Sequence, residues 1–382
     1  MAAREDVYQK LRDEISKMPI PMPPAESGVE LNLLRHLFTP EEAAIALNLN
    51  ILPENLGRIH RRVAKSGIAI TREELESVLD HLVDVGAILG GGLFEAKGKG
   101  KLYSLSQMVV GMFEFQVDRL TPAYVRDFNQ YMDERFHMAL LPGKTAQMRT
   151  IPVSTAVTPE MHIARYEDIK AYVRGLKDDI AVANCVCRQS TEVSGGKCGH
   201  SDIMETCLMF KDAARFALGR KKGRRLDNAG ALEILDRAEK AGFILQPENA
   251  RNPQFVCCCC TDCCHAIKVL KRHPRPSELL ISNYRAVIDP VKCKGCKKCL
   301  DRCAMGAISL MDKTAVVDPD RCIGCGVCVA SCANGAHRLI PKEKRYVPPR
   351  THDAMYQKIL MERLGVMKTL KAVSRVVTGR KA

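Results

Sequence analysis

The feature that most constrains this 382-residue chain is a cysteine pattern that occurs twice near its C-terminal end. The run C-x2-C-x2-C-x3-C begins at Cys293 and again at Cys322, and similar flanks, AVIDPVK and AVVDPDR, precede the two runs. Zinc sites built from C-x2-C pairs are the alternative. Three evenly spaced cysteines and a fourth, repeated with matching flanks, favour metal clusters instead. The segment is therefore expected to fold as two similar halves around metal.

These eight cysteines predict two [4Fe–4S] clusters. Each iron of such a cube takes one thiolate, and in two-cluster proteins with this run the fourth cysteine binds the cluster of the other half. Gly295 and Gly324 relieve crowding where the backbone wraps each cube. We therefore assign one cluster to Cys293, Cys296, Cys299 and Cys332, and the other to Cys322, Cys325, Cys328 and Cys303.

Residues 284–341 resemble a bacterial two-cluster ferredoxin domain on the strength of this doubled run. Apolar pairs beside the loops, Val287–Ile288 and Val316–Val317, predict its strands. The proline that usually follows the fourth cysteine is replaced by Ala304 and Ala333, a departure that leaves the thiolates in place. The resemblance implies a small sandwich that transfers electrons.

Ten of the 18 cysteines lie outside this segment, all between residues 185 and 264. Disulfide frameworks are typical of short secreted chains, whereas the N-terminal stretch here is charged and has no apolar signal core. We therefore expect a cytoplasmic protein whose thiols are reduced and bind metal. No window approaches 18 uncharged apolar residues, so no membrane span is expected.

The ten central cysteines are enough for one or two further clusters. The simplest division gives one site Cys185, Cys187, Cys198 and Cys207, and another site Cys257, Cys260, Cys263 and Cys264. Adjacent strand residues point to opposite faces, so all six cysteines of 257–264 cannot bind one cube. A mixed arrangement, structural zinc and buried free thiols stay open. His200 and His265 could bind metal or hydrogen-bond to its ligands, and Arg188 could offset thiolate charge.

Residues 28–283 also resemble a group of iron–sulfur proteins of anaerobes. The resemblance rests on RTIPV, CVCRQ, ETCLMF, ALEILDRAEKAG and the cysteine-rich octet 257–264. Members tend to carry a further cysteine where this chain has Asp262, and a small polar residue where it has Cys258. The group implies electron transfer inside a larger redox assembly, and no settled substrate comes with it.

Residues 28–108 read as a winged helix-turn-helix domain, in which amphipathic helices precede a hairpin with a Gly/Lys tip. Such domains often bind DNA. The helix before the wing, residues 72–84, opposes this because its charges would repel phosphates. It carries Glu73, Glu74, Glu76, Asp80 and Asp84 against Arg72 alone. The preceding helix and the wing tip are basic through Arg58, Arg61, Arg62, Lys65, Lys97, Lys99 and Lys101. We expect a protein-docking domain rather than a nucleic-acid-binding one.

The remaining segments carry less chemistry. Residues 1–27 predict a helix and a Pro-rich linker, and residues 109–150 predict a helical connector. The sequence PGKTA is no P-loop, because Met138 stands where glycine is needed. Residues 342–382 carry most of their charge as Lys and Arg and predict a basic amphipathic tail. Near one stripe of this tail lie its apolar residues Tyr356, Ile359, Leu360, Met367 and Leu370. The tail could dock in a partner's groove, lie on an anionic membrane, or fold back on the chain, and we expect a contact with a redox partner there.

Together these patterns predict an α+β protein with a winged-helix-like N-terminal domain, a mixed cysteine-rich domain at 151–283 and a ferredoxin domain at 284–341. We expect a multi-cluster electron-transfer protein, a subunit or partner of a larger anaerobic oxidoreductase, and no catalytic side chains of its own. A redox-sensing transcription regulator and a reductase with an open-site central cluster are the alternatives.

Overall fold

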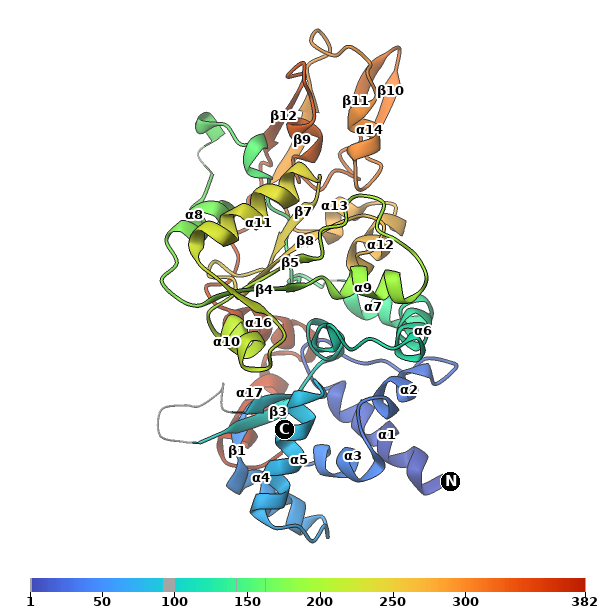
Figure 1. Cartoon of the computed structure of the whole chain (residues 1–382), viewed down its shortest axis with the longest axis vertical. Helices are drawn as coiled ribbons and strands as arrows, with labels where there is room; N and C mark the ends of the chain where they lie inside the picture. Colours follow the sequence, from blue (N-terminus) through green and yellow to red (C-terminus); the bar gives the residue numbers. More distant parts are fainter. Residues whose placement is uncertain (1, 92–99, 142, 162, 382) are drawn as a thin grey trace. The chain divides into compact units, whose positions relative to one another are not determined.

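The computed structural model describes residues 2–91, 100–141, 143–161 and 163–381. The chain divides into two compact units, Met1–Leu140 with Gln357–Ala382, and Leu141–Tyr356 (Figure 1). Its mixture of helices and strands is that of an α+β protein. None of the helices in the described ranges is long and apolar enough to cross a membrane.

The first unit is mainly helical. Its N-terminal helices are α1 (Ala2–Ile15), α2 (Val29–Arg35), α3 (Pro40–Ala46), α4 (Leu56–Lys65), α5 (Arg72–Asp84), α6 (Pro122–Tyr131) and α7 (His137–Leu140). Its strands β1 (Glu54–Asn55), β2 (Ile88–Gly91) and β3 (Leu102–Leu105) form an antiparallel sheet in the order β1-β3-β2. The helices α3 and α5 begin at capping boxes, because Thr39 and Thr71 each exchange hydrogen bonds with a glutamate three residues later.

The hairpin predicted as a wing corresponds to β2 and β3, which follow α5 directly. Its tip, with Lys97 and Lys99, lies outside the described residues. Lys101 is described, and it forms ion pairs with Asp80 at 2.5 Å and Glu76 at 3.2 Å on α5. The acidic helix therefore holds this wing lysine by charge.

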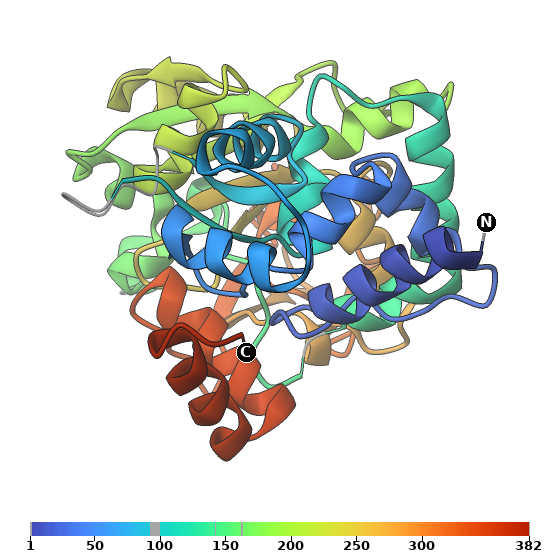
Figure 2. The same cartoon turned by 90° about the horizontal axis from the view of Figure 1, so that it is seen from below.

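The C-terminal segment completes the first unit. Helix α16 (His352–Leu364) crosses the division between the units, and α17 (Val366–Val377) belongs to the first unit. Arg363 donates to the backbone oxygens of residues 16–18, and Lys381 to the oxygen of Leu47. Arg58 of α4 donates to Val376 O at 3.3 Å. The tail thus folds back on its own chain (Figure 2), which is one of the three arrangements that its sequence allows.

The folded-back tail also divides the apolar stripe expected along it. Ile359 and Leu360 are buried, whereas Met367 and Leu370 are exposed. Two basic groups of the tail, Arg363 and Lys381, bond to the backbone of the first unit, whereas Lys368 and Lys371 are exposed.

The second unit contains a five-stranded antiparallel sheet in the order β6-β4-β5-β8-β7. These strands are β4 (Ile180–Asn184), β5 (Glu205–Phe210), β6 (Arg224–Leu226), β7 (Ile244–Pro247) and β8 (Phe255–Cys259). The associated helices are α8 (Ile169–Arg174), α9 (Val186–Val193), α10 (Lys211–Gly219), α11 (Asn228–Lys240), α12 (His265–Arg272) and α13 (Pro276–Leu279). Alternation along β5 buries Thr206, Leu208 and Phe210 on one face and turns Cys207 to the other.

The doubled cysteine runs lie between two antiparallel strand pairs of the same unit. They follow β9 (Tyr284–Ile288) and β11 (Thr314–Val317), which pair with β12 (His337–Pro341) and β10 (Ile308–Met311). The short helices α14 (Lys298–Arg302) and α15 (Val327–Ala330) close the two loops. One continuous apolar core contains Leu245, Cys258, Tyr284 and Ile323. The central and C-terminal segments, predicted as separate domains, therefore share a core.

Candidate metal centres

Each cysteine run lines its own cavity and takes a fourth cysteine from the other run. One cavity, named the inner site, is lined by Cys303, Cys322, Cys325 and Cys328. The other, named the outer site, is lined by Cys293, Cys296, Cys299 and Cys332. Each cavity thus gathers one of the two cysteine sets that the spacing assigns to a cluster, including the crossing of the fourth cysteines.

Backbone N–H groups point at cysteine sulfurs in both sites. Two of these bonds join residues four apart, and two come from the strands that precede the opposite loop. The N–H group of Ala307 donates to Cys303 Sγ at 3.2 Å and that of Ala336 to Cys332 Sγ at 3.3 Å. The N–H group of Ala286 donates to Cys322 Sγ and that of Ala315 to Cys293 Sγ, both at 3.4 Å. The bond from Ala315 lowers the pKa of Cys293. Such bonds favour the thiolate, the form that binds iron.

A glycine shapes each loop where no side chain fits. Gly324 has φ of 64°, and a Cβ there would lie 2.1 Å from Tyr284 O. Gly295 has φ of 63°, and a Cβ there would lie 2.5 Å from Lys313 O. The crowding predicted at both positions therefore comes from the neighbouring backbone.

The two sites differ in exposure. Cys322 and Cys328 of the inner site are buried, and burial raises the pKa of Cys325 to about 12. Cys296 of the outer site is exposed, and Lys297 and Lys298 beside it are exposed as well. The inner site is thus enclosed by protein, while the outer site opens to solvent.

Six central cysteines come together from four segments, and we name them the six-thiol site. Cys207 of β5 pairs with Cys257 of β8, and Cys259 lies two residues further on the same face. Cys264 is the N-cap of α12. Cys185 and Cys187, at the start of α9, complete the set.

Hydrogen bonds between the sulfurs define this site. Cys187 bonds to Cys185 and Cys264, and Cys257 bonds to Cys207 and Cys259. Acceptance of such bonds lowers the pKa of Cys185, Cys257 and Cys264. Donation of them raises the pKa of Cys187 and Cys259. The sulfurs of this site thus lie within hydrogen-bond reach of one another, as thiols gathered around one metal centre would.

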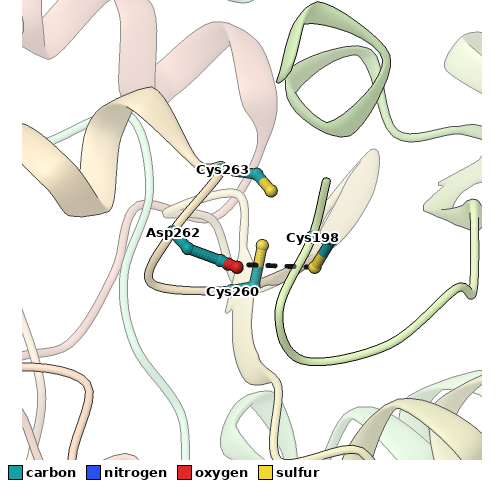
Figure 3. Close-up of side chains that lie close together, drawn as sticks. All are labelled: Cys198, Cys260, Asp262 and Cys263. Atoms are coloured by element: carbon teal, nitrogen blue, oxygen red, sulfur yellow. Dashed lines mark hydrogen bonds between the residues drawn. The ribbon is translucent and has the colours of Figure 1, made fainter. Parts of the chain in front are cut away.

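A second central group lies where the loop between α9 and β5 meets the turn after β8. Cys198, Cys260, Cys263 and Asp262 each offer a ligand atom, and these four atoms all lie within 4.8 Å of one another (Figure 3). Burial raises the pKa of Cys263 to about 11. Burial would also raise the pKa of Asp262, but the hydrogen bond from Gly199 N helps to hold it below its ordinary value. We name this group the Cys3Asp site.

Arg188 supplies positive charge to both central groups. The side chain is only 1% exposed and donates to Ile203 O, Thr206 Oγ1 and Cys258 O. Burial alone would lower the pKa of Arg188, but the negative charge of Cys185, Cys260 and Cys198 raises it. This agrees with its predicted role of offsetting thiolate charge.

The simplest division of the central cysteines differs from this placement. That division groups Cys198 with Cys185, yet the Cys198 sulfur lies with those of Cys260 and Cys263. The structure thus brings cysteines of both groups together, as in the mixed arrangement, because the loop that carries Cys198 closes over the turn after β8.

Two central residues were missed as candidate ligands. Cys259 faces the six-thiol site, and the two-residue period of a strand that contains Cys257 could have indicated it. Cys258 points to the opposite face and joins the apolar core. Asp262 stands among three cysteines, at the position where the resembling proteins tend to carry a further cysteine.

Comparison with protein families assigns the C-terminal part of this unit. Residues 292–336 match the family model of the 4Fe-4S dicluster domain. The chain thus contains an iron–sulfur domain of the ferredoxin type. The match to this dicluster domain covers both cysteine runs. Searches of curated proteins and of solved structures found no match.

The cavities of the dicluster domain fit the 4Fe-4S clusters that the family binds. Besides the cysteines and the N–H donors to sulfur, the outer cavity is lined by His337, whose buried Nδ1 atom has no hydrogen-bond partner among the described residues. At the six-thiol site, Nε2 of Gln246, a buried residue of β7, is equally unpartnered within the described ranges. Its strand position opposite Cys257 would let it donate to a cluster sulfur.

Proposed function

We propose that this protein relays electrons between the dicluster domain and a [4Fe–4S] cluster bound by four thiolates of the six-thiol site. The observation that carries the proposal is the shared core of the second unit, to which Cys322 and Cys328 of the inner site belong together with Cys259 and Cys264. Electron transfer needs buried, closely spaced centres, and a common core provides a rigid path between them.

The segment RTIPV is a physical link along this path. Val153 N donates to Cys325 O at 2.9 Å, and Ile151 N donates to Leu245 O at 3.2 Å. Leu245 precedes Gln246, which is paired with Cys257. One short segment therefore contacts both the inner loop and the strand beside the six-thiol site.

The difference in exposure gives the relay an order. The exposed outer cluster would exchange electrons with a partner, and the enclosed inner cluster would pass them to or from the centre. Lys294, Lys297 and Lys298 stand around the outer loop and suit an acidic partner surface. We place the contact with a larger anaerobic oxidoreductase here rather than on the C-terminal tail, because these lysines stand beside an exposed cluster cysteine, whereas Arg363 and Lys381 of the tail bond to the backbone of the first unit.

The contacts of the first unit support a protein-docking role over DNA binding. Arg62 is paired with the buried carboxylate of Glu54, and Arg58 donates to the tail backbone. Lys101 is held by Asp80, whose hydrogen bond raises the pKa of this lysine. These basic groups are thus already engaged, while α5 remains acidic.

Metal analysis of anaerobically purified protein tests the number of clusters. We expect about 12 iron and about 12 acid-labile sulfide per chain in clusters, from two cubes in the dicluster domain and one in the six-thiol site. Cys207→Ser should remove the central EPR signal of the reduced protein and leave the dicluster signals. A content of about 8 iron with an unchanged Cys207→Ser spectrum would contradict the central cluster.

Delivery of electrons tests the relay itself. Reduction by an acidic redox protein should slow in a Lys294→Glu/Lys297→Glu/Lys298→Glu variant, and more so at low salt, where charges are least screened. A matching reversal at exposed Lys358, Lys368 and Lys371 of the tail is the control. Equal slowing in both variants would contradict docking at the outer loop.

A further inference from the structure

We propose that the Cys3Asp site binds a single divalent transition-metal ion, of the class that includes Zn²⁺ and Fe²⁺, rather than a cluster. The inference does not depend on a cluster at the six-thiol site. It rests on the spacing of the ligand atoms, the orientation of Asp262, and the charge around the group.

The spacing separates a single ion from a cube. A tetrahedral ion with metal–sulfur bonds of about 2.3 Å brings its ligand atoms to about 3.8 Å from one another. The four cysteine sulfurs of a cubane bind different corners and lie roughly 6 Å apart. All four ligand atoms of the Cys3Asp site lie within 4.8 Å of one another, which suits one ion. Across the described ranges, no other group of three or more potential ligands is packed to this limit.

The carboxylate of Asp262 is held in the orientation of a ligand. Its Oδ2 atom accepts a hydrogen bond from Gly199 N at 2.5 Å. Its Oδ1 atom is turned toward the sulfurs and lies 3.8 Å from Cys198 Sγ (Figure 3). One oxygen is thus anchored by the backbone while the other faces the three thiols, as in metal sites whose carboxylate ligands are themselves hydrogen-bonded.

The surroundings supply further support and balance charge. His200 Nε2 lies 2.8 Å from Thr261 Oγ1 and 3.8 Å from Asp262 Oδ1. Three thiolates and one carboxylate exceed the charge of a divalent ion, and buried Arg188 lies near enough to Cys198 and Cys260 to offset part of the excess. Cys260 and Cys263 are buried, whereas Cys198 and Asp262 are partly exposed. An ion can therefore reach the site from solvent.

The donor set indicates the class of ion. Thiolates select zinc and iron over magnesium and calcium, and a tetrahedral set of sulfur with one oxygen is compatible with both Zn²⁺ and Fe²⁺. The zinc and iron contents of the purified protein would distinguish the two ions. Such an ion would fasten the loop of Cys198 to the turn that leads from β8 to α12.

Metal and sulfide counts on the full chain, with Zn²⁺ as the probe, test the proposal. Anaerobic protein carrying its clusters is equilibrated with Zn²⁺ in a chelator buffer. Wild type should bind one zinc tightly, and Cys198→Ser should bind it at least about 100-fold more weakly with no loss of acid-labile sulfide. Asp202→Asn, a change at an exposed acid of the same loop, is the control and should match wild type. A loss of about four iron and four sulfide in Cys198→Ser, or retention of the zinc, would overturn the proposal.

A second variant keeps all four donors and so avoids loss of the fold. Asp262→Cys should still bind one zinc, and zinc-edge X-ray absorption should change from three sulfur neighbours and one oxygen to four sulfurs at about 2.3 Å. The zinc edge is independent of iron in the clusters. A wild-type spectrum with fewer than three sulfurs, or one that Asp262→Cys leaves unchanged, would overturn this ligand set.

Discussion

Cys303 and Cys332 show how single residues organise the dicluster domain. Cys303 is the C-cap of α14, Cys332 directly follows the C-cap of α15, and each lines the cavity of the other loop. Their sulfurs accept equivalent bonds from Ala307 and Ala336. A change at one of these residues should therefore affect the cluster of the opposite run.

Paired variants test this crossing. Cys303→Ser/Cys322→Ser removes two ligands of the inner site and should lose about 4 iron. Cys303→Ser/Cys299→Ser removes one ligand from each site and should lose about 8, although these residues are closer in sequence. Iron counts after anaerobic purification give the answer. The reverse order of losses would show that each run binds its own cube.

Arg188 is the residue whose charge should matter most to the centre. In Arg188→Met we expect the central cluster to be harder to reduce, with the equilibrium constant for its reduction about tenfold lower. Reduction adds negative charge to the cluster, and this variant lacks the buried cation that would balance it. Arg188→Lys should show a smaller change. EPR-monitored redox titration measures both, and Arg224→Met, at an exposed arginine of β6, is the control. Equal midpoint potentials in wild type and Arg188→Met would exclude this role.

At the scale of elements, backbone conformation and helix ends set the sites. The left-handed glycines let the two loops wrap around their cavities, and N-caps of α9 and α12 bring Cys185 and Cys264 to the six-thiol site. The first residue of α16 adds a contact of another kind. His352 Nδ1 lies 2.5 Å from a carboxylate oxygen of buried Glu248 and holds this helix start to the sheet region.

Two glycine variants separate conformation from crowding. Gly324→Ala places a methyl group against Tyr284 O and should prevent assembly of the inner cluster, with a loss of about 4 iron. Gly335 also has a positive φ, but a Cβ there would meet open space. Gly335→Ala should therefore lower the free energy of unfolding by about 1 kcal/mol and leave the iron content unchanged. Iron content and thermal unfolding measure the pair. Equal iron in the two variants would contradict the role of crowding at Gly324.

His352 predicts a pH dependence of stability. Burial would lower the pKa of His352, but the hydrogen bond and charge of Glu248 raise it above its ordinary value. A group with a raised pKa in the folded state stabilises the protein fully below its unfolded pKa, about 6.5, and loses this effect as pH rises through the folded value. The stability difference between wild type and His352→Gln should therefore shrink from pH 6 upward in thermal unfolding. A difference that grows with pH would contradict the pairing.

For the whole molecule, the division into two units separates the metal chemistry from the helical part. All 18 cysteines lie in Leu141–Tyr356. Within this unit the inner loop packs on the segment before the sheet, since Val153 N bonds to Cys325 O and a Cβ at Gly326 would lie 2.5 Å from Ala156 Cβ. The dicluster domain thus depends on contacts outside its own matched residues.

Fragments test this dependence. Residues 141–356 should carry the same iron and sulfide per chain as the full protein, because every ligand and the shared core are retained. Residues 284–341 alone should lose the inner cluster preferentially, since they lack the contacts of Val153 and Ala156. Iron counts and EPR of both fragments provide the measurement. Full loading of the short fragment would contradict the structural dependence.

The sequence by itself indicated the metal class, the eight cysteines that line the two cavities of the dicluster domain, and the strands beside their loops. It could do so because these features are local: cysteine spacing within one loop repeats wherever the chemistry is the same. The dicluster family match confirms the iron–sulfur class.

Tertiary structure alone decided the partition of the central cysteines and the place of the tail. Cys207 meets Cys257 through strand register, and Cys198 joins Cys260 through closure of a loop across more than sixty residues. The sequence names these thiols as candidates, but their grouping depends on which distant segments pair. Likewise, the bonds of Arg363 and Lys381 in the tail could not be read from the sequence, because their acceptors include backbone oxygens, which every residue has.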